Sequence, residues 1–188
     1  AYAEERLVAA HRLVPLPPEV DETTAAAAML KGMTARYLLR RTHRLAAGET
    51  VLLHSAAGGV GLIAAQWARS LGATVIGTVS TDAKAELARA AGCAHVVVTS
   101  REDFVARVDE ITGGAGVRVV YDSVGKETFE GSLDCLAPLG LMVSYGNSSG
   151  PVPPVSPLLL SQKGSLFLTR PTLMAYTARR EDLLETAA

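Results

Sequence analysis

The chain has 188 residues, of which 48% are hydrophobic and 20% are charged, a balance typical of a globular protein and not of a disordered one. Its formal net charge of −1 gives no overall field that would recruit nucleic acid or an acidic membrane. Two cysteines are too few for a disulfide framework, and no apolar run approaches the roughly 18 residues of a membrane span, so we expect a cytoplasmic protein.

The N-terminal part is expected to hold an extended segment followed by a helix. Residues 1–20 carry an alternating, strand-like run and three prolines, Pro15, Pro17 and Pro18. Residues 20–45 read as one long helix, or as two broken near Gly32, with Asp21 as the N-cap. The chain has no initiator Met and stops inside an expected helix, so we expect it to be a piece of a longer protein.

From Glu49 onward a short β-branched run, a turn and an amphipathic helix repeat. Strands are expected at 50–54, 73–79, 95–99, 117–123, 140–146 and 165–169. Helices are expected at 59–71, 82–91, 102–112, 126–136, 156–162 and 176–187. Strands that alternate with helices of this length imply parallel pairing, and their nearly continuous apolar character implies burial on both faces. The pattern predicts a doubly wound α/β (Rossmann) domain of about six strands.

The turn after the first expected strand is rich in glycine. It reads "SAAGGVG", Ser55 to Gly61, so Ala56 stands where the fingerprint G-x-G-x-x-G would begin. The later glycines keep the positions that let the backbone approach a pyrophosphate and let the helix pack against the strand. Alanine suffices at the first position if its φ is negative. A preceding strand and a following helix favour a dinucleotide site over a structural turn, with candidate residues Gly58, Gly59, Val60 and Gly61.

The end of the second expected strand indicates which dinucleotide binds. NAD-binding chains usually have an acidic residue about 20 positions after the glycines, to hold the ribose hydroxyls. Here that position is Ser80, whose hydroxyl can donate to a 2′-phosphate, and Lys84 can supply the charge. Thr81 lies between them, and Asp82 is expected to serve the next helix as its N-cap or in its first turn. The pattern favours NADP(H), although Lys84 alone would fit an ordinary solvated lysine.

Several motifs in order resemble one family. The run "HSAAGGVGLIAAQWARSLGATVIGTVSTDAKAELARAAG" is similar to the zeta-crystallin-like quinone oxidoreductases of the medium-chain dehydrogenase/reductase superfamily. "KGMTARYLL", "EITGGAGVRVVYDSVG", "SLDCLAPLGLMVSYGNSSG" and "QKGSLFLTRP" look like further motifs of that family. The resemblance implies that residues 1–20 are the trailing edge of an N-terminal catalytic (GroES-like) domain. Residues 21–188 would then be the dinucleotide-binding domain.

The resemblance also implies further cofactor contacts. Thr34 looks like the family threonine near the nicotinamide, and Ser123 would lie by the adenosine half. Thr99 stands where close relatives often carry a tyrosine toward the 2′-phosphate. The loop after the fifth strand would line the cofactor cleft with Tyr145, Gly146, Asn147 and Ser148. Each of these residues also has an ordinary interpretation, as packing for Tyr145 or as a chain turn for Asn147.

The sequence argues against zinc. It has no C-x-x-C or H-x-x-x-H pair, and Leu30 stands where zinc-dependent relatives place a cysteine ligand. His54, beside the glycine turn, is interpreted as a packed or capping histidine and not as a catalytic base, and Cys135 fits a buried helix cysteine as well as a nucleophile. No catalytic residue is assigned.

The resemblance implies an NADPH-dependent, zinc-independent quinone reductase whose fragment would be inactive alone. Three alternatives stay open: reduction of an enone or enoyl thioester, a zinc-type alcohol dehydrogenase relative, and a non-catalytic, crystallin-like NADPH-binding module. An apolar last strand at Gly164 to Thr169 would be an unprotected sheet edge, so we expect a homodimer through it.

Overall fold

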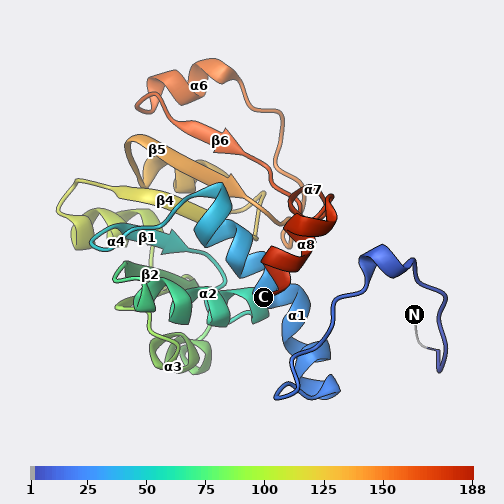
Figure 1. The fold of residues 1–188 in the computed structure, drawn as a ribbon. Coiled ribbons are helices and arrows are strands. Elements are labelled where there is room, and N and C mark those ends of the chain that lie inside the picture. The colour runs from blue at the N-terminus through green and yellow to red at the C-terminus, as the bar shows by residue number, and fades with distance from the viewer. Residues whose placement is uncertain (1–2) are drawn as a thin grey trace.

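The computed structural model describes residues 3–188, and a single six-stranded sheet forms its centre (Figure 1). The strand order is β3-β2-β1-β4-β5-β6, and every neighbouring pair is parallel. The strands are β1 (Thr50–Leu53), β2 (Thr74–Val79), β3 (His95–Val98), β4 (Val117–Asp122), β5 (Leu136–Ser144) and β6 (Phe167–Thr169). This is the doubly wound order of dinucleotide-binding folds, so the predicted fold class is confirmed.

Helices connect the strands. Before the sheet come a short 3₁₀ turn, η1 (Ala10–Arg12), the helix α1 (Glu22–Tyr37) and a π-helical turn, η2 (Leu38–Thr42). The crossovers hold α2 (Gly59–Ser70), α3 (Asp82–Ala90), α4 (Phe104–Thr112), α5 (Phe129–Asp134) and α6 (Pro157–Gln162). The chain closes with α7 (Leu173–Tyr176) and α8 (Arg180–Ala187). None of the helices within residues 3–188 is both long enough and apolar enough to cross a membrane.

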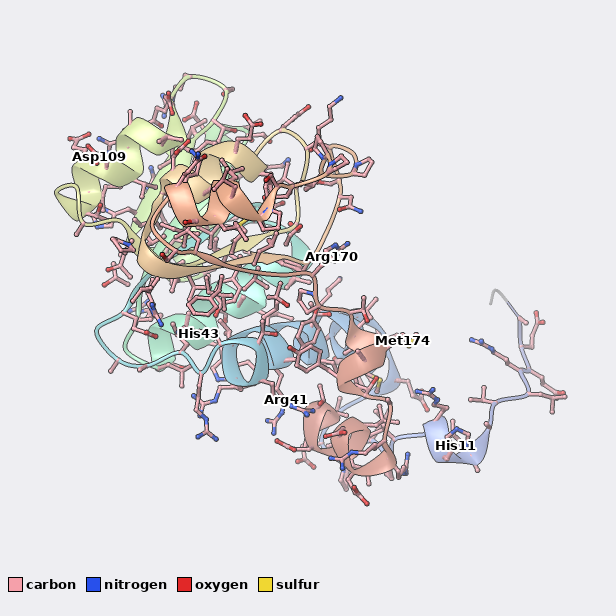
Figure 2. The ribbon with its side chains drawn as sticks, turned by 90° about the horizontal axis from the view of Figure 1, so that it is seen from above. His11, Arg41, His43, Asp109, Arg170 and Met174 are labelled. Carbon is pink, nitrogen blue, oxygen red and sulfur yellow. The ribbon has the colours of Figure 1, made fainter. Side chains whose placement is uncertain are left out.

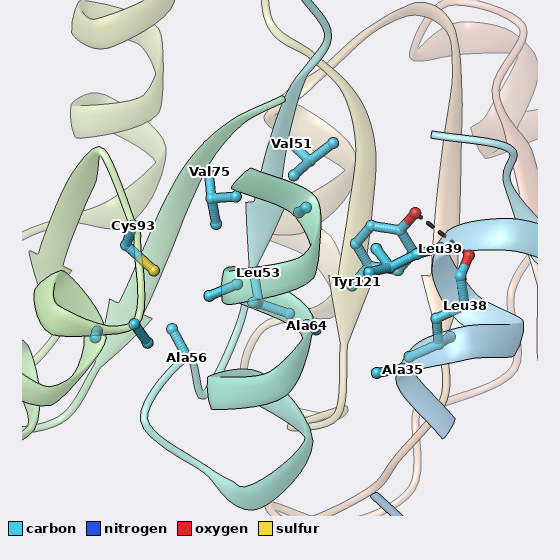
Figure 3. Packing of buried hydrophobic residues seen from close by; sticks show 14 of the residues in the cluster. Ala35, Leu38, Leu39, Val51, Leu53, Ala56, Ala64, Val75, Cys93 and Tyr121 are labelled. Atoms are coloured by element: carbon cyan, nitrogen blue, oxygen red, sulfur yellow. Dashed lines mark hydrogen bonds between the residues drawn. The ribbon is translucent and has the colours of Figure 1, made fainter. Parts of the chain in front are cut away.

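Alternate residues of each strand enter two separate cores. Val51 and Leu53 of β1 pack with α1, α2 and α3 on one face, where Figure 3 shows them beside Val75 and Tyr121. Leu52, between them, packs on the other face with residues of α4 and α5. Because successive side chains of a strand point to opposite faces, a sheet covered on both faces needs apolar residues throughout, as the sequence pattern indicated.

The structure decides the choice left open for the first helix. α1 runs without a break past Gly32, and Asp21 caps it by accepting a hydrogen bond from the Thr24 N–H at 2.8 Å. The strand-like interpretation of residues 1–20 is wrong for the described part, because residues 3–20 contain η1 and pair with no strand. The segment around His11 lies apart from the sheet (Figures 1 and 2). Residues 1–2 lie outside the described residues.

Two other boundaries differ from expectation. β5 begins at Leu136, four residues before the expected start, with an irregularity near Leu139, whose φ is +61°. The expected helix at 176–187 starts later, as α8, and only Tyr176 of its range belongs to the preceding helix α7. Thr172 caps α7, which lets Tyr176 stack on Tyr37 at 4.6 Å between ring centroids before the chain turns again. Tertiary packing therefore ends one helix at Tyr176, where the sequence pattern placed the start of another.

Candidate functional site

A cleft of about 420 Å³ opens at the carboxyl ends of the strands. β1 lies between β2 and β4, so the chain turns outward in opposite directions here, and ligands bind at such switch points in open α/β sheets. The lining residues are Ser55, Ala57, Gly58, Thr78, Val79, Ser80, Lys84, Thr99, Glu102, Asp103, Phe104, Val124, Glu127 and Thr128.

The glycine turn forms one wall of this cleft. The residue with a left-handed conformation is Ser55, with φ +55°, whereas Ala56 has no positive φ and is fully buried. The Ala56 N–H donates to the Thr78 carbonyl at 3.0 Å, and the Gly58 N–H donates to the Ser55 carbonyl at 2.8 Å. The tight turn therefore rests on Ser55, which explains why alanine is tolerated at the first fingerprint position.

Two glycines of the turn have almost no room for a side chain. A Cβ on Gly61 would lie 2.4 Å from the Ser55 carbonyl oxygen and 2.6 Å from that of Ala56. A Cβ on Gly58 would lie 3.0 Å from the Ser55 oxygen. Gly58 is also the N-cap of α2 and has no side chain, so the first N–H groups of this helix stay open to a ligand. Such a helix start binds anions through its N–H groups and its dipole.

The second strand ends in a hydroxyl and an amine. Lys84 Nζ donates to Ser80 Oγ at 3.1 Å, so the two side chains predicted to bind the 2′-phosphate lie together in the cleft. Thr81 caps α3 by accepting from the Lys84 N–H at 3.3 Å, and Asp82 is the first residue of the helix. Thr99 lies alongside, where its hydroxyl donates to the Val79 carbonyl at 3.2 Å.

Two of the acidic residues that line the cleft, Glu102 and Asp103, are held by their own neighbours. Glu102 accepts from the Val98 N–H at 2.9 Å and pairs with Arg107 at 3.4 Å. Asp103 caps α4 by accepting from the Val105 N–H at 2.8 Å. Lys84 is the cation among the residues that line the cleft, and it lies where the β2 end meets the pocket.

The loops after β4 and β5 are packed together. The Tyr145 N–H donates to the Asp122 carbonyl at 2.7 Å, and the Ser148 N–H donates to the Ser123 carbonyl at 3.1 Å. A Cβ on Gly146 would lie 2.6 Å from the Ser123 carbonyl oxygen, so this glycine allows the close approach. Burial raises the pKa of Tyr145 to about 12, against the opposing effect of a hydrogen bond from Ser123. The phenol is therefore protonated at neutral pH.

His54 lies beneath the cleft and is completely buried. Its Nδ1 lies 2.9 Å from Thr78 Oγ1 and its Nε2 lies 2.9 Å from Ser132 Oγ. Burial lowers its pKa to about 4, although the Asp122 charge acts in the opposite direction. A neutral imidazole with both nitrogens engaged is a structural group, as the sequence interpretation held.

Comparison with known proteins identifies the family. The profile of the zinc-binding dehydrogenases matches residues 59–186. The chain belongs to the zinc-binding dehydrogenase family. It is 55% identical to a quinone oxidoreductase of Pseudomonas aeruginosa over 183 residues, which are 97% of this chain and 56% of that protein. It is 52% identical to a 2-haloacrylate reductase of a Burkholderia species over 188 residues, covering 98% of this chain and 56% of that protein.

A solved structure shares the fold closely. The crystal structure of Escherichia coli quinone oxidoreductase, determined in complex with NADPH, superposes with a TM-score of 0.88 and is 56% identical. The superposition covers 91% of this chain and 52% of that one. These relatives confirm the resemblance found in the sequence. The chain spans about half the length of the relatives it matches.

The name of the zinc-binding dehydrogenase family raises the question of a metal ion. Within residues 3–188, no three His, Cys, Asp or Glu side chains are grouped so as to hold one. Cys93 and Cys135 are buried and free, and burial raises the pKa of their thiols to about 11 and about 12. The donor set of the described residues does not fit a zinc ion.

The structure brings only some of the predicted site residues together. Of these, Gly58, Ser80, Lys84 and Thr99 line the cleft. Thr34 is buried in α1, where its hydroxyl donates to the Leu30 carbonyl at 2.8 Å. Asn147 lines a different pocket, of about 290 Å³, next to β5 and β6. The others are not among the residues lining the cleft within residues 3–188: Gly59, Val60, Gly61, Thr81, Ser123, Tyr145, Gly146 and Ser148.

Sequence reasoning missed several residues of this region. Phe104 and Thr128 line the cleft as the first residue of α4 and the N-cap of α5, and neither carries a motif that the sequence pattern links to a nucleotide. Arg101 pairs with Asp82 at 2.8 Å and so places a second cation near Lys84. Lys31 extends from α1 across Gly59, where a Cβ would lie 2.7 Å from the lysine Cδ. The signal for Arg101 was its position three residues after the end of β3, at the edge where ligands bind.

Proposed function

We propose that this chain is the NADPH-binding domain of a zinc-independent quinone oxidoreductase. The observation that carries the proposal is the pairing of Lys84 Nζ with Ser80 Oγ at 3.1 Å, at the carboxyl end of β2. A hydroxyl and an ammonium there suit a 2′-phosphate, and no carboxylate takes the position that would repel it. The E. coli relative determined with NADPH, at 56% identity, supports the same cofactor.

The glycine turn fits a bound pyrophosphate. Side chains are excluded at Gly58 and Gly61 by contacts of 3.0 Å or less with backbone oxygens, so the main chain is bare where the phosphates would approach. The N–H groups of Gly59 and Val60 open α2 and would donate to the phosphate oxygens. The Lys31 side chain, which covers Gly59, would bring positive charge to the same place.

The remaining predicted residues would serve the two ends of the cofactor. Thr81 and Thr99 would border the 2′-phosphate, and Ser123 the adenosine half. Thr34 and the loop of Tyr145, Gly146, Asn147 and Ser148 would border the nicotinamide. NADPH, when bound, supplies the hydride, so the protein's part is to position cofactor and acceptor and to exclude water.

A second candidate acceptor is an activated carbon–carbon double bond. The observation that favours it is the 52% identity to a 2-haloacrylate reductase, whose named substrate is an unsaturated acid. The cofactor end is compatible with both reactions, because Ser80 and Lys84 would hold the same NADPH in either one. The two differ in the acceptor pocket, so parallel assays with a benzoquinone and a haloacrylate distinguish them.

Three broader features belong to the same proposal. Residues up to 20 would be part of a catalytic domain, which is supported by the exposure of Leu7 and Leu13. A homodimer would form through the edge at Gly164 to Thr169, where Phe167 is 59% exposed. A reducing, cytoplasmic setting is supported by the two cysteines that remain free.

Nucleotide titration tests the cofactor assignment. We expect NADPH to bind at least tenfold more tightly than NADH by calorimetry. Lys84→Ala should weaken NADPH binding about tenfold and leave NADH binding unchanged, because only NADPH carries the 2′-phosphate. Arg89→Ala is the matched control, since it removes a cation from the same helix that pairs with Glu86 instead. Equal affinity for NADH and NADPH in the wild type would refute the assignment.

Turnover tests the reaction. The protein that carries this chain should oxidise NADPH in the presence of a quinone and leave NADH unused. NADPH binding without turnover of a quinone or a haloacrylate would instead favour a non-catalytic NADPH-binding module.

A further inference from the structure

A continuous polar chain crosses the protein beneath the cleft. Thr78 Oγ1 and Ser132 Oγ each lie 2.9 Å from a nitrogen of His54. The Ser132 hydroxyl donates to the Thr128 carbonyl at 2.7 Å, and the Thr128 hydroxyl donates to Asp122 Oδ2 at 2.8 Å. All five residues are at most 9% exposed. The chain thus joins β1 and β2 to α5 and to the end of β4.

The hydrogen-bond pattern defines the protonation of His54. Ser132 has one hydroxyl proton and donates it to the Thr128 carbonyl, so its oxygen accepts from His54 Nε2–H. Nδ1 is then the unprotonated nitrogen and accepts from the Thr78 hydroxyl. Every polar atom of the imidazole is satisfied, which a buried polar group requires. An apolar side chain could fill the same space without these hydrogen bonds, so filling space is not the only role of His54.

The partners of His54 are residues that line the cleft. Thr78 and Thr128 line it from β2 and from the start of α5. Phe104, at the start of α4, lines it as well, and its ring meets the imidazole edge-on with centroids 5.0 Å apart. At the far end, Asp122 Oδ1 accepts from the N–H groups of Val124 and Gly125, at 2.7 and 3.1 Å. One buried side chain therefore contacts or is linked to walls from three elements.

We propose that His54 is a positioning residue for the adenosine half of the dinucleotide. It holds Thr78, Thr128 and Phe104 in the arrangement that forms the walls beside Ser80 and Lys84. The inference rests on the proposed function, because Ser80 and Lys84 mark the ribose end of the cofactor. His54 itself touches no substrate, so its effect is on cofactor affinity and not on the chemical step.

The test compares cofactor affinity and stability in the protein that carries this chain. Dissociation constants for NADPH and for adenosine 2′,5′-bisphosphate are measured by calorimetry for the wild type, His54→Leu, His54→Gln and Ser132→Ala. We expect His54→Leu to weaken both ligands about tenfold and His54→Gln to weaken them less, because an amide keeps one hydrogen bond. In turnover, KM for NADPH should rise about tenfold while kcat changes less than twofold.

Tyr121→Phe is the matched control. It also removes a buried hydroxyl of the central sheet, but this one donates to the Leu38 carbonyl at 3.4 Å on the other face (Figure 3). It should shift the melting temperature and leave both dissociation constants within twofold of the wild type. Ser132→Ala keeps His54 in place, so it provides the measurement if the His54 variants fail to fold.

The possible results separate the positioning role of His54 from the proposed function. Wild-type affinity in folded His54→Leu or Ser132→Ala protein would overturn the positioning role, while the proposed function would stand. A kcat that falls with unchanged affinity would overturn it too. A wild-type protein that binds neither ligand would refute the proposed function and this inference together. Weaker binding of the bisphosphate in proportion to NADPH would support the role and locate it at the adenosine half.

Discussion

Individual residues of the site are fixed by neighbours that the local sequence does not reveal. His54 follows a strand and precedes a glycine turn, a place where an open, reactive side chain would be reasonable. Its burial comes from Phe104 and Ser132, which are 50 or more positions later in the chain. The environment therefore keeps the imidazole neutral in the folded protein at neutral pH.

This environment predicts a pH dependence of stability. The His54 pKa is about 4 in the folded protein and 6.5 in its ordinary state, so the unfolded chain takes up the proton first as the pH falls. The group's contribution is fully present above about pH 6.5 and is lost as the pH falls toward 4. Between pH 7 and pH 5 this loss is about 2 kcal/mol. Urea unfolding at both pH values should show it.

The comparison variant for this prediction is His54→Leu, which has no group that titrates there. Its free energy of unfolding should fall less between pH 7 and pH 5 than that of the wild type, by about 2 kcal/mol. Parallel curves for the two proteins would show that His54 is not the group responsible.

Among the elements, α2 packs so closely against the turn before it that Gly61 has no room for a side chain. The helix begins directly on the turn after β1, and Gly61 is the residue that faces the turn's carbonyl oxygens. The close contact fixes the start of α2 directly after Gly58, which lines the cleft. The packing of this helix and the presentation of its N-terminus are therefore one feature.

Gly61→Ala should disturb both. A Cβ there would lie 2.4 Å from a backbone oxygen that cannot rotate away, so the helix must shift. We expect a loss of about 1–3 kcal/mol in the free energy of unfolding, with weaker NADPH binding. Gly32→Ala is the control, because Gly32 lies inside α1 with nothing within 4 Å of its Cβ position. It should stabilise the protein by about 0.5–1 kcal/mol. Equal effects at the two sites would contradict the packing argument.

Elements with a strong local pattern could be predicted from the sequence. The six strands are buried on both faces and flanked by turns, so periodicity placed each of them, within two residues at either end except at the start of β5. The start of β5 could not be predicted, because it depends on Leu139 taking a positive φ beside Pro138 and Gly140. The helix α7, which the sequence pattern did not place, ends at Tyr176, and this residue stacks on Tyr37 in a contact between distant parts of the chain.

Only the part of the candidate site that has a local sequence pattern could be predicted. Ser80 and Lys84 are four residues apart around the start of one helix, so the sequence alone places them together. The far wall of the cleft comes from Phe104 and Thr128, which reach it through tertiary packing. No spacing in the sequence connects these residues to the glycine turn.

At the scale of the whole molecule, the sheet has one conspicuous edge. β6 pairs only with β5 among the described strands, and Figure 1 shows it at the margin of the sheet. Phe167 and Leu168 are 59% and 37% exposed there. An apolar edge strand invites pairing with another strand unless it is covered.

Phe167→Glu should therefore convert the proposed homodimer into a monomer, because the carboxylate would be buried without a partner at the joint. Light scattering measures the mass directly. Met174→Glu is the control, since Met174 is 72% exposed on α7 and is not part of β6. A wild-type protein that is monomeric throughout the accessible concentration range would refute the dimer.

The strand order also has a consequence for how the protein folds. Val51 of β1 is aligned with Val75 on one side, through a local crossover, and with Val119 on the other, which is much more distant along the chain. Parallel pairing at long range is slow because the intervening loop must first be closed. The β1–β2–β3 half can thus assemble before β4 pairs with β1. The cleft is lined by Ser80, from the β1–β2–β3 half, and by Thr128, which follows β4. A nucleotide bound there would hold the two parts of the sheet together and protect the backbone amides between β1 and β4 against hydrogen exchange.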